Sequence, residues 1–189
     1  CSVHTIPDNF GKLNQLETLD LSNNNLSEFS NKIKEIGFDN TIDSLATNLL
    51  KNKVECLLIM IDKEGDLAHP DESVRDKAVE NHKRWVDAAA RLGCHSIRVN
   101  TNGTTIEDLW LVAAEDGLRK LSTYAQSKKI NVIVENHGGF SSHPEKLMQV
   151  INKLNLSNCG TLPDFGNWCI KRKKTPSFVK LNMKIITKE

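Results

Sequence analysis

The chain has almost no net charge and no long apolar run. Its 189 residues include 25 Lys and Arg residues against 24 Asp and Glu residues, so the formal charge is +1. Domains that bind nucleic acid or an acidic membrane surface usually carry a clear positive excess, so we expect neither partner. Every apolar run is far shorter than the ~20 residues that cross a bilayer. The sequence therefore predicts no membrane segment.

Cysteine is scarce and irregularly spaced. There are five cysteines, an odd number, and no pair has the C-x-x-C spacing. Cys56, Cys94 and Cys159 lie in or beside expected strands, where a thiol is usually a small buried apolar group. The N-terminus has no basic stretch followed by an apolar one, so it predicts no signal peptide. We therefore expect reduced thiols and a cytoplasmic protein.

The sequence alternates between apolar strands and amphipathic helices. Strands rich in β-branched residues and buried on both faces are typical of parallel sheets. The expected strands cover 54–62, 94–100, 129–135 and 159–164, and the expected helices cover 71–92, about 109–128 and 144–154. Consecutive strand ends are about 30 to 40 residues apart, which is the length of a βα unit. Right-handed crossovers then give a parallel α/β sheet, either doubly wound or part of a (β/α)8 barrel.

The glycine fingerprint of dinucleotide-binding sheets is missing. Asn102-Gly103 and Gly138-Gly139 follow expected strands without the G-x-G-x-x-G spacing. This absence weakens the dinucleotide-binding interpretation of a doubly wound sheet.

The N-terminal part is less regular. In residues 1–28, Leu13, Leu16, Leu19, Leu21, Asn24 and Leu26 follow the spacing of a single leucine-rich repeat. One repeat cannot bury its own apolar edge, so we expect an irregular segment and a main domain over 29–189.

Smaller elements are expected on either side of the strand and helix units. They are a short helix over 29–36 that ends at Gly37, a short strand over 38–43, a helix over 45–53, and one further strand or helix over 178–186.

Two of the strands end in carboxylates that stand beside further polar residues. Glu135 is followed by Asn136 and His137, and Asp164 is followed by Asn167. The C-terminal ends of parallel strands are where ligands bind in α/β proteins. One such acid is often an ion pair or a helix cap, but two on consecutive strands predict a site for a hard divalent ion. His137 is close enough in sequence to orient a substrate or to add a nitrogen ligand.

Two stretches, Val134–Gly139 and Leu162–Trp168, resemble the sugar phosphate isomerase/epimerase family of xylose isomerase-like TIM barrels. Ile59–Gly65 and Gly93–Asn100 look like earlier strands of that family, and the resemblance extends over about residues 29 to 169. It implies a (β/α) barrel with a divalent metal, Mn²⁺ or Mg²⁺ first and Zn²⁺ or Co²⁺ as other options. Glu135 matches the family's strand-5 Glu, a metal ligand and acid/base beside the sugar carbonyl carbon. Asp164 matches the strand-6 Asp, a second metal ligand.

The sequence departs from the family after Asp164. The family adds a His on strand 7 and a Glu on strand 8, and no acceptable residue of either kind follows here. It often has a His where this chain has Asn167. A complete barrel typically needs about 250 residues, so we expect an incomplete barrel of about five to six βα units, truncated at its C-terminus.

The resemblance implies a sugar or sugar phosphate isomerase or epimerase, with activity lost if this chain stands alone. Glu135 would be catalytic, and Arg98, His137 and Asn167 would bind the small-molecule sugar or sugar phosphate. Unpaired strand edges would favour a homo-oligomer. One alternative is a non-catalytic remnant or interaction protein. A second, an endonuclease-like barrel acting at abasic DNA, ranks last because Asp62 and Asn100 stand where zinc-binding histidines would be expected.

Overall fold

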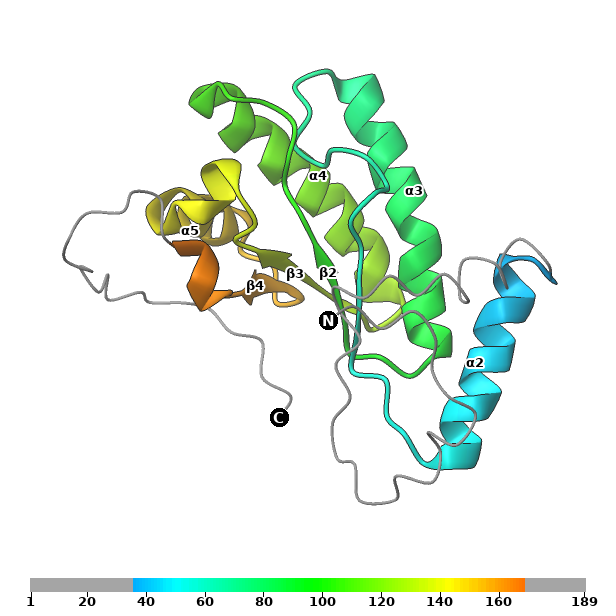
Figure 1. The fold of residues 1–189 in the computed structure, drawn as a ribbon. Coiled ribbons are helices and arrows are strands. Elements are labelled where there is room, and N and C mark those ends of the chain that lie inside the picture. Colours follow the sequence, from blue (N-terminus) through cyan, green and yellow to red (C-terminus); the bar gives the residue numbers. More distant parts are fainter. Residues whose placement is uncertain (1–35, 169–189) are drawn as a thin grey trace. The chain divides into compact units, whose positions relative to one another are not determined.

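The computed structural model describes residues 36–168 (Figure 1). The predicted segment over 1–28 and the predicted element over 178–186 lie outside the described residues, as does nearly all of the predicted helix over 29–36. The chain divides into two units, one of Cys1–Cys56 with Arg91–Gly93 and the other of Leu57–Ala90 with Cys94–Glu189. None of the helices in the described part is long and apolar enough to cross a membrane.

The larger unit contains the predicted parallel sheet. Its strands are β1 (Leu58–Met60), β2 (Ser96–Val99), β3 (Asn131–Glu135) and β4 (Cys159–Leu162), and they pair in the order β1-β2-β3-β4. A strand order that follows the chain order is that of a (β/α) barrel, because the order in a doubly wound sheet reverses at a switch point. The prediction of an incomplete parallel barrel is confirmed for this part of the chain.

Three helices connect the strands. They are α3 (Glu72–Arg91), α4 (Glu107–Ser127) and α5 (Pro144–Leu154), and the predicted ranges differ from these bounds by only a few residues. Two short 3-10 helices, η2 (Gly139–Ser142) and η3 (Phe165–Trp168), follow β3 and β4. Helix α4 packs against both β3 and α5 (Figure 1). The chain therefore returns along helices after each strand, as a barrel requires.

The core lies between α4 and the two central strands. All four residues of β2 and the last four of β3 are buried. The largest fully buried side chains around them include Ile97, Val99, Trp110, Leu118, Leu121 and Val132. Both faces of these strands are covered, so any polar side chain within them is buried or nearly so. The charged groups within them, Arg98 and Glu135, are therefore exceptions that need partners.

One prediction in the smaller unit is wrong. Residues 38–43, expected to be a strand, form the first turns of a single helix, α2 (Phe38–Asn52), which also includes the helix expected over 45–53. Ile36, directly before Gly37, is helical, so Gly37 separates it from α2, with a φ of 84° that suits glycine. Both the N–H and the hydroxyl of Thr41 bond to the Gly37 carbonyl. These are the first backbone bond of the helix and a side-chain bond to the same carbonyl, and no side chain caps the Gly37 end.

Strand β1 is shorter than predicted. The expected strand over 54–62 contracts to three residues, because the N–H of Val54 bonds to the carbonyl of Leu49 and not to a neighbouring strand. Beyond the strand, the Ile61 N–H still donates to the Arg98 carbonyl at 2.9 Å. Within the described residues β1 and β4 each pair with one neighbour only. The expected homo-oligomer stays a prediction that rests on these two edges.

Gly117 marks the closest approach between α4 and the loop after β1. A Cβ atom built on this glycine would stand 2.0 Å from the backbone oxygen of Leu67. No real side chain tolerates such a contact, so the helix can sit this close only because residue 117 has none.

We expect Gly117→Ala to lower the free energy of unfolding by about 1 to 3 kcal/mol, because the added methyl pushes α4 away from the loop. In an unconstrained helix the same change would raise stability by ~1 kcal/mol. Urea unfolding followed by circular dichroism measures the difference, with the exposed Thr123→Ala change on the same helix as control. A stabilised Gly117→Ala variant would show that the contact does not exist.

Candidate functional site

Arg98 joins the ends of the first three strands. Its Nε lies 2.8 Å from Glu135 Oε2, and its Nη1 donates a hydrogen bond to Asp62 Oδ1. The Arg98 and Glu135 side chains are only 4% and 8% exposed. A buried charge is tolerated only when it is paired, so the one guanidinium compensates a carboxylate on either side of it.

Pairing with Arg98 lowers the pKa of the Asp62 carboxyl. Partial burial alone would raise its pKa, but the hydrogen bond and the positive charge of Arg98 outweigh burial, and Asn100 adds a bond from its amide at 3.1 Å. The net effect is a pKa below the usual value for aspartate. Asp62 therefore stays ionised at neutral pH beside Arg98.

Asn167 connects the two predicted metal ligands. Its side-chain Nδ2 lies 3.3 Å from Glu135 Oε1 and 3.1 Å from Asp164 Oδ2. On the other side of Glu135, His137 Nδ1 lies 3.2 Å from the same Oε1 atom. His137 is 58% exposed, so its ring is open to solvent. All five residues predicted from sequence thus fall into one connected group.

We call Asp62, Arg98, Glu135, His137, Asp164 and Asn167 the strand-end cluster. Its shape depends on Asn136, which is fully buried. The Asn136 amide donates to the Asp164 carbonyl at 2.8 Å and accepts from the Asp164 N–H at 2.6 Å. This two-way bond fixes the chain after β4 against the chain after β3. Sequence reasoning saw Asn136 only as a polar neighbour, and nothing in its position distinguished this role.

The backbone also orients Asp164. The N–H of Gly166 donates to Asp164 Oδ1 at 2.7 Å, which leaves Oδ2 toward Asn167. Glu135 is divided in the same way, with Oε2 at Arg98 and Oε1 toward Asn167 and His137. Each acid therefore presents one oxygen to a shared space. Oxygens of this kind suit a hard divalent ion.

The donor set is incomplete for a protein-built metal site. Among the described residues, Glu135, Asp164 and His137 do not bring three ligand atoms close enough to hold one ion. Two carboxylate oxygens fit the chemistry of Mn²⁺ or Mg²⁺, but water or further protein groups would have to fill the other positions.

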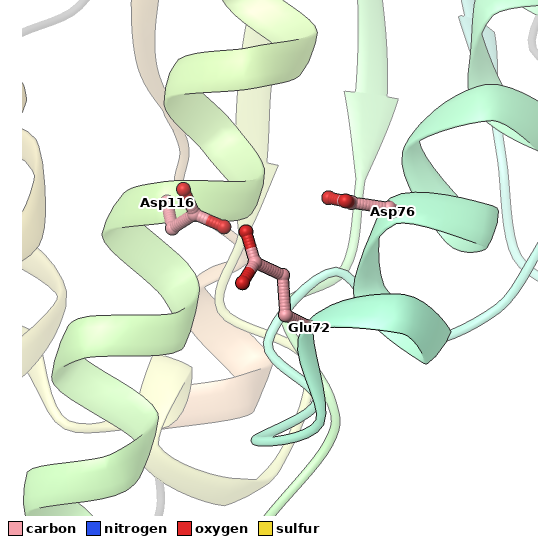
Figure 2. Close-up of side chains that lie close together, drawn as sticks. All are labelled: Glu72, Asp76 and Asp116. Carbon is pink, nitrogen blue, oxygen red and sulfur yellow. The ribbon is translucent and has the colours of Figure 1, made fainter.

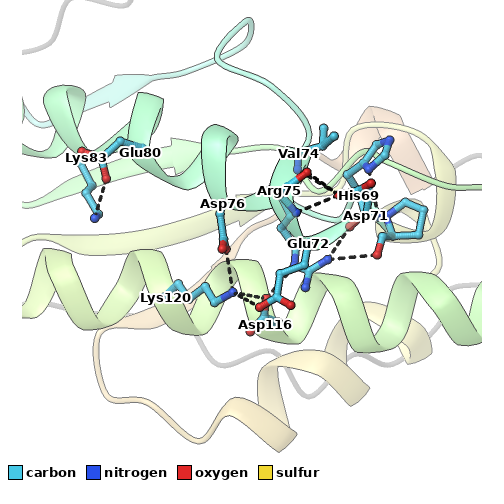
Figure 3. Close-up of polar contacts among 12 residues, drawn as sticks. His69, Asp71, Glu72, Val74, Arg75, Asp76, Glu80, Lys83, Asp116 and Lys120 are labelled. Atoms are coloured by element: carbon cyan, nitrogen blue, oxygen red, sulfur yellow. Dashed lines mark hydrogen bonds and ion pairs between the residues drawn. The ribbon is translucent and has the colours of Figure 1, made fainter.

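Three other acids do approach one another closely. Ligand atoms of Glu72, Asp76 and Asp116 lie within 4.8 Å of each other (Figure 2). Figure 3 shows why this acidic trio needs no metal: the ammonium of Lys120 lies among the three carboxylates. Its Nζ is 3.1 Å from Glu72, 2.6 Å from Asp76 and 2.9 Å from Asp116. The bonds to Asp116 and Asp76 raise the pKa of Lys120.

The family comparison matches most of the chain. The sequence model of one family, described as a xylose isomerase-like TIM barrel, matches residues 9–185. No curated protein matches the chain at a comparable level of similarity.

Solved structures match the fold. A 3-keto-D-glucoside 4-epimerase from E. coli has a TM-score of 0.63 at 18% identity, over 78% of this chain and 65% of that one. A D-psicose 3-epimerase, studied in the presence of D-fructose, has a TM-score of 0.59 at 16% identity, over 71% of this chain and 51% of that one. A xylose isomerase-like TIM barrel protein from Mycobacterium smegmatis, in complex with magnesium, has a TM-score of 0.56 at 17% identity, over 69% of this chain and 48% of that one. The chain thus spans roughly half to two thirds of the length of these structures, and at such identities the likeness shows the fold alone.

We expect Arg98→Met to destabilise the protein by about 3 to 5 kcal/mol, because it leaves the buried Glu135 carboxylate without its cation. The double variant Arg98→Met with Glu135→Gln should recover most of this loss, because it also removes the unpaired, buried charge of the Glu135 carboxylate. Urea unfolding of the parent, the two single variants and the double variant completes a double-mutant cycle. Equal losses in Arg98→Met and in the double variant would contradict the pairing.

Lys120→Met should remove the cation that the acidic trio shares. The groups are part-exposed, so we expect a loss of only about 1 kcal/mol in unfolding free energy near neutral pH. A raised lysine pKa contributes stability below the unfolded pKa, and this contribution disappears as pH rises through the folded value. The difference between the variant and the parent should therefore shrink at strongly alkaline pH, and also in acid, where the carboxylates are protonated. A difference independent of pH would point to lost packing instead.

Proposed function

Because the chain belongs to the xylose isomerase-like TIM-barrel family, we propose that it takes part in sugar isomerisation or epimerisation, by proton transfer at the carbon beside the sugar carbonyl. One observation carries the proposal. Glu135 and Asp164, at the ends of adjacent parallel strands, each present one oxygen to the same amide of Asn167. The carboxyl ends of barrel strands are where this fold places its active sites.

We assign the metal to the two carboxylate oxygens of the strand-end cluster that face the Asn167 amide. Glu135 Oε1 and Asp164 Oδ2 would hold Mn²⁺ or Mg²⁺, with Zn²⁺ or Co²⁺ as other options. A bound ion would act as a Lewis acid on the sugar carbonyl. Support comes from the magnesium in one structural relative and from the oxygen donors present here. The cluster carries three carboxylates and one guanidinium, so its negative excess favours a cation.

Glu135 is the proposed acid/base. A carboxylate that moves a proton must be held at a fixed angle to the reacting carbon. Arg98 holds Oε2 and the ion would take Oε1, so Glu135 can accept and return a proton only through an oxygen that one of these partners releases. His137 is exposed beside it and can donate a hydrogen bond to a sugar oxygen, and the Asn167 amide can do the same.

The role of Arg98 is less direct than the sequence suggested. Its binding to sugar oxygens or phosphate stays a prediction, since the guanidinium is buried and both of its acidic partners belong to the protein. The contacts described favour a positioning role toward Glu135. A sugar hydroxyl would reach it only by displacing Asp62, whose side chain is 59% exposed.

A non-catalytic protein is the second candidate. Its support is that the described residues bring no third ligand atom close to Glu135 and Asp164. The abasic-site endonuclease alternative remains weaker, because Asp62 and Asn100 occupy the first strand ends and bond to each other. The cytoplasmic location also stays a prediction.

Metal titration tests the proposed site. We expect the chain to bind Mn²⁺ weakly, and Glu135→Gln or Asp164→Asn to weaken binding by about tenfold or more. Isothermal titration calorimetry measures both, with Asp108→Asn as the matched control because that exposed acid lies outside the strand-end cluster. Binding that survives both substitutions would place the ion elsewhere.

Proton exchange tests the reaction. With Mn²⁺ in D₂O, we expect no detectable exchange at the sugar α-carbon by this chain alone, because two carboxylates leave the ion loosely held. A protein extended to full barrel length, with the family's two further ligands, should exchange the proton and lose this activity in Glu135→Gln. If the extended protein exchanges no proton with any of a broad panel of ketoses, the non-catalytic candidate replaces the enzyme.

A further inference from the structure

His137 is an exposed residue on a backbone that is held in place. Its side chain is open to solvent, and the two glycines that follow it are exposed as well. Residues in exposed loops usually move more than the strands they follow. Here the His137 N–H donates to the Glu135 carbonyl at 2.9 Å, so the exposed stretch is bonded to the strand end from its first residue.

The hydroxyl of Ser142 bonds on both sides of His137. The Gly138 N–H donates to Ser142 Oγ at 2.8 Å, and Ser142 Oγ donates to the Asn136 carbonyl at 3.2 Å. These two groups belong to the two peptide units that flank the His137 Cα atom. We call the two bonds the serine bridge. Ser142 is buried, so water competes little for either bond.

Two glycines let the chain turn back far enough for this contact. Gly138 has a φ of 79° and Gly139 a φ of 56°, both in the left-handed region that glycine adopts without strain. Ser142 is the last residue of η2 and stands two residues before the start of α5. The serine bridge therefore connects the end of β3 to the start of α5.

The serine bridge determines where the His137 ring lies. With the backbone on both sides fixed, the ring can move only by rotation of its own side chain, and its Nδ1 lies 3.2 Å from Glu135 Oε1. On a mobile backbone an exposed ring would spread over many positions. A group that meets a ligand at a fixed place loses less entropy when it is held there beforehand.

The loop that the serine bridge closes also forms one wall of a cavity of about 310 Å³. Gly139 and Phe140 contribute to this wall, and the loop between β2 and α4 contributes to another. That second loop is held through its backbone, because a Cβ on Gly103 would stand 2.2 Å from the Ala68 carbonyl carbon. Gly139 is two residues from His137, so the serine bridge fixes the ring and the adjoining cavity wall together.

We propose that Ser142 is a positioning residue, whose hydroxyl holds the backbone on both sides of His137 so that the ring stays beside Glu135 before a ligand binds. The inference rests on the proposed function, because it assumes that His137 contacts the substrate at this place. Ser142 acts through His137 and takes no part in the proton transfer itself.

NMR relaxation and amide exchange of the 189-residue chain test this without metal or substrate. In the parent chain we expect the backbone N–H groups of His137 and Gly138 to have order parameters of about 0.85, as in rigid strands. Ser142→Ala should lower both below about 0.6. It should also speed exchange of the Gly138 N–H about tenfold, the effect of one lost hydrogen bond. The Asp164 N–H, which bonds to the Asn136 side chain, should exchange as in the parent.

The His137 ring gives the readout that a purely structural serine would not change. Carbon-13 relaxation of labelled histidine rings should show a restricted His137 ring in the parent and a mobile one in Ser142→Ala, and the signal lost in His137→Gln identifies it. Ser141→Ala is the matched control. This neighbouring serine is also buried, but its hydroxyl bonds to the Gly138 carbonyl at 2.8 Å, beyond the two peptide units that flank His137. Its loss should leave the ring restricted.

Three results would overturn the proposal: a His137 ring that is already mobile in the parent chain, a ring that stays restricted in Ser142→Ala, or equal release of the ring in Ser141→Ala and Ser142→Ala. The first of these needs no variant, so the proposal can fail even if Ser142→Ala does not fold. A restricted ring that Ser142→Ala releases, in a protein whose extended form exchanges no sugar proton, would leave the role of Ser142 standing and remove the enzyme.

Discussion

The position of one buried guanidinium decides what the strand ends of this protein can do. Arg98 stands in the middle of the sheet edge with an acid on each side, and its side chain is almost entirely removed from water. Taking the Arg98 and Glu135 charges out of solvent is costly, and the mutual attraction offsets that cost only while the geometry holds. The carboxyl ends of β1, β2 and β3 are therefore tied in register by electrostatics as well as by the backbone ladder. The orientation of Glu135, and with it any chemistry at Oε1, depends on this pairing.

The two acid clusters show how the same fold can use carboxylates differently. Between α3 and α4, a single lysine reaches all three acids and fills the space that an ion would take. At the strand ends the arginine takes only one oxygen of Glu135, while the backbone and Asn136 hold Asp164 from the other side. One oxygen of each acid is left toward a neutral amide. A candidate site differs from a structural cluster in having carboxylate oxygens that no protein cation neutralises, not in the number of acids.

The parts that sequence predicted well were those with a strong local signal. Long periodic helices such as α3 and the doubly buried strands β2 and β3 were placed to within a few residues. The acids Glu135 and Asp164, which the sequence put at neighbouring strand ends, both bond to the Asn167 amide. The failures lie where tertiary contacts override the pattern. Residues 38–43 look like a strand but form a helix started at Gly37, and the strand expected over 54–62 contracts to Leu58–Met60. Sequence also could not show that Arg98 would point at protein acids, because Asp62 is far from it along the chain.

The contact between Gly103 and the Ala68 backbone bears on how this protein can change over evolutionary time. The main chain sets the distance between the two loops there, because a Cβ on Gly103 would stand 2.2 Å from the Ala68 carbonyl carbon. The cavity beside them is lined by Thr101, Asn102, Thr104 and Thr105 together with the rings of Trp110 and Phe140. A side chain at Gly103 would push the two loops apart, so that position is constrained to glycine. Exchanges among the hydroxyl and amide groups would leave the frame intact and change only the polar groups that the cavity presents. The architecture thus separates the glycine that must be kept for folding from neighbouring residues that can change by single substitutions without loss of the fold.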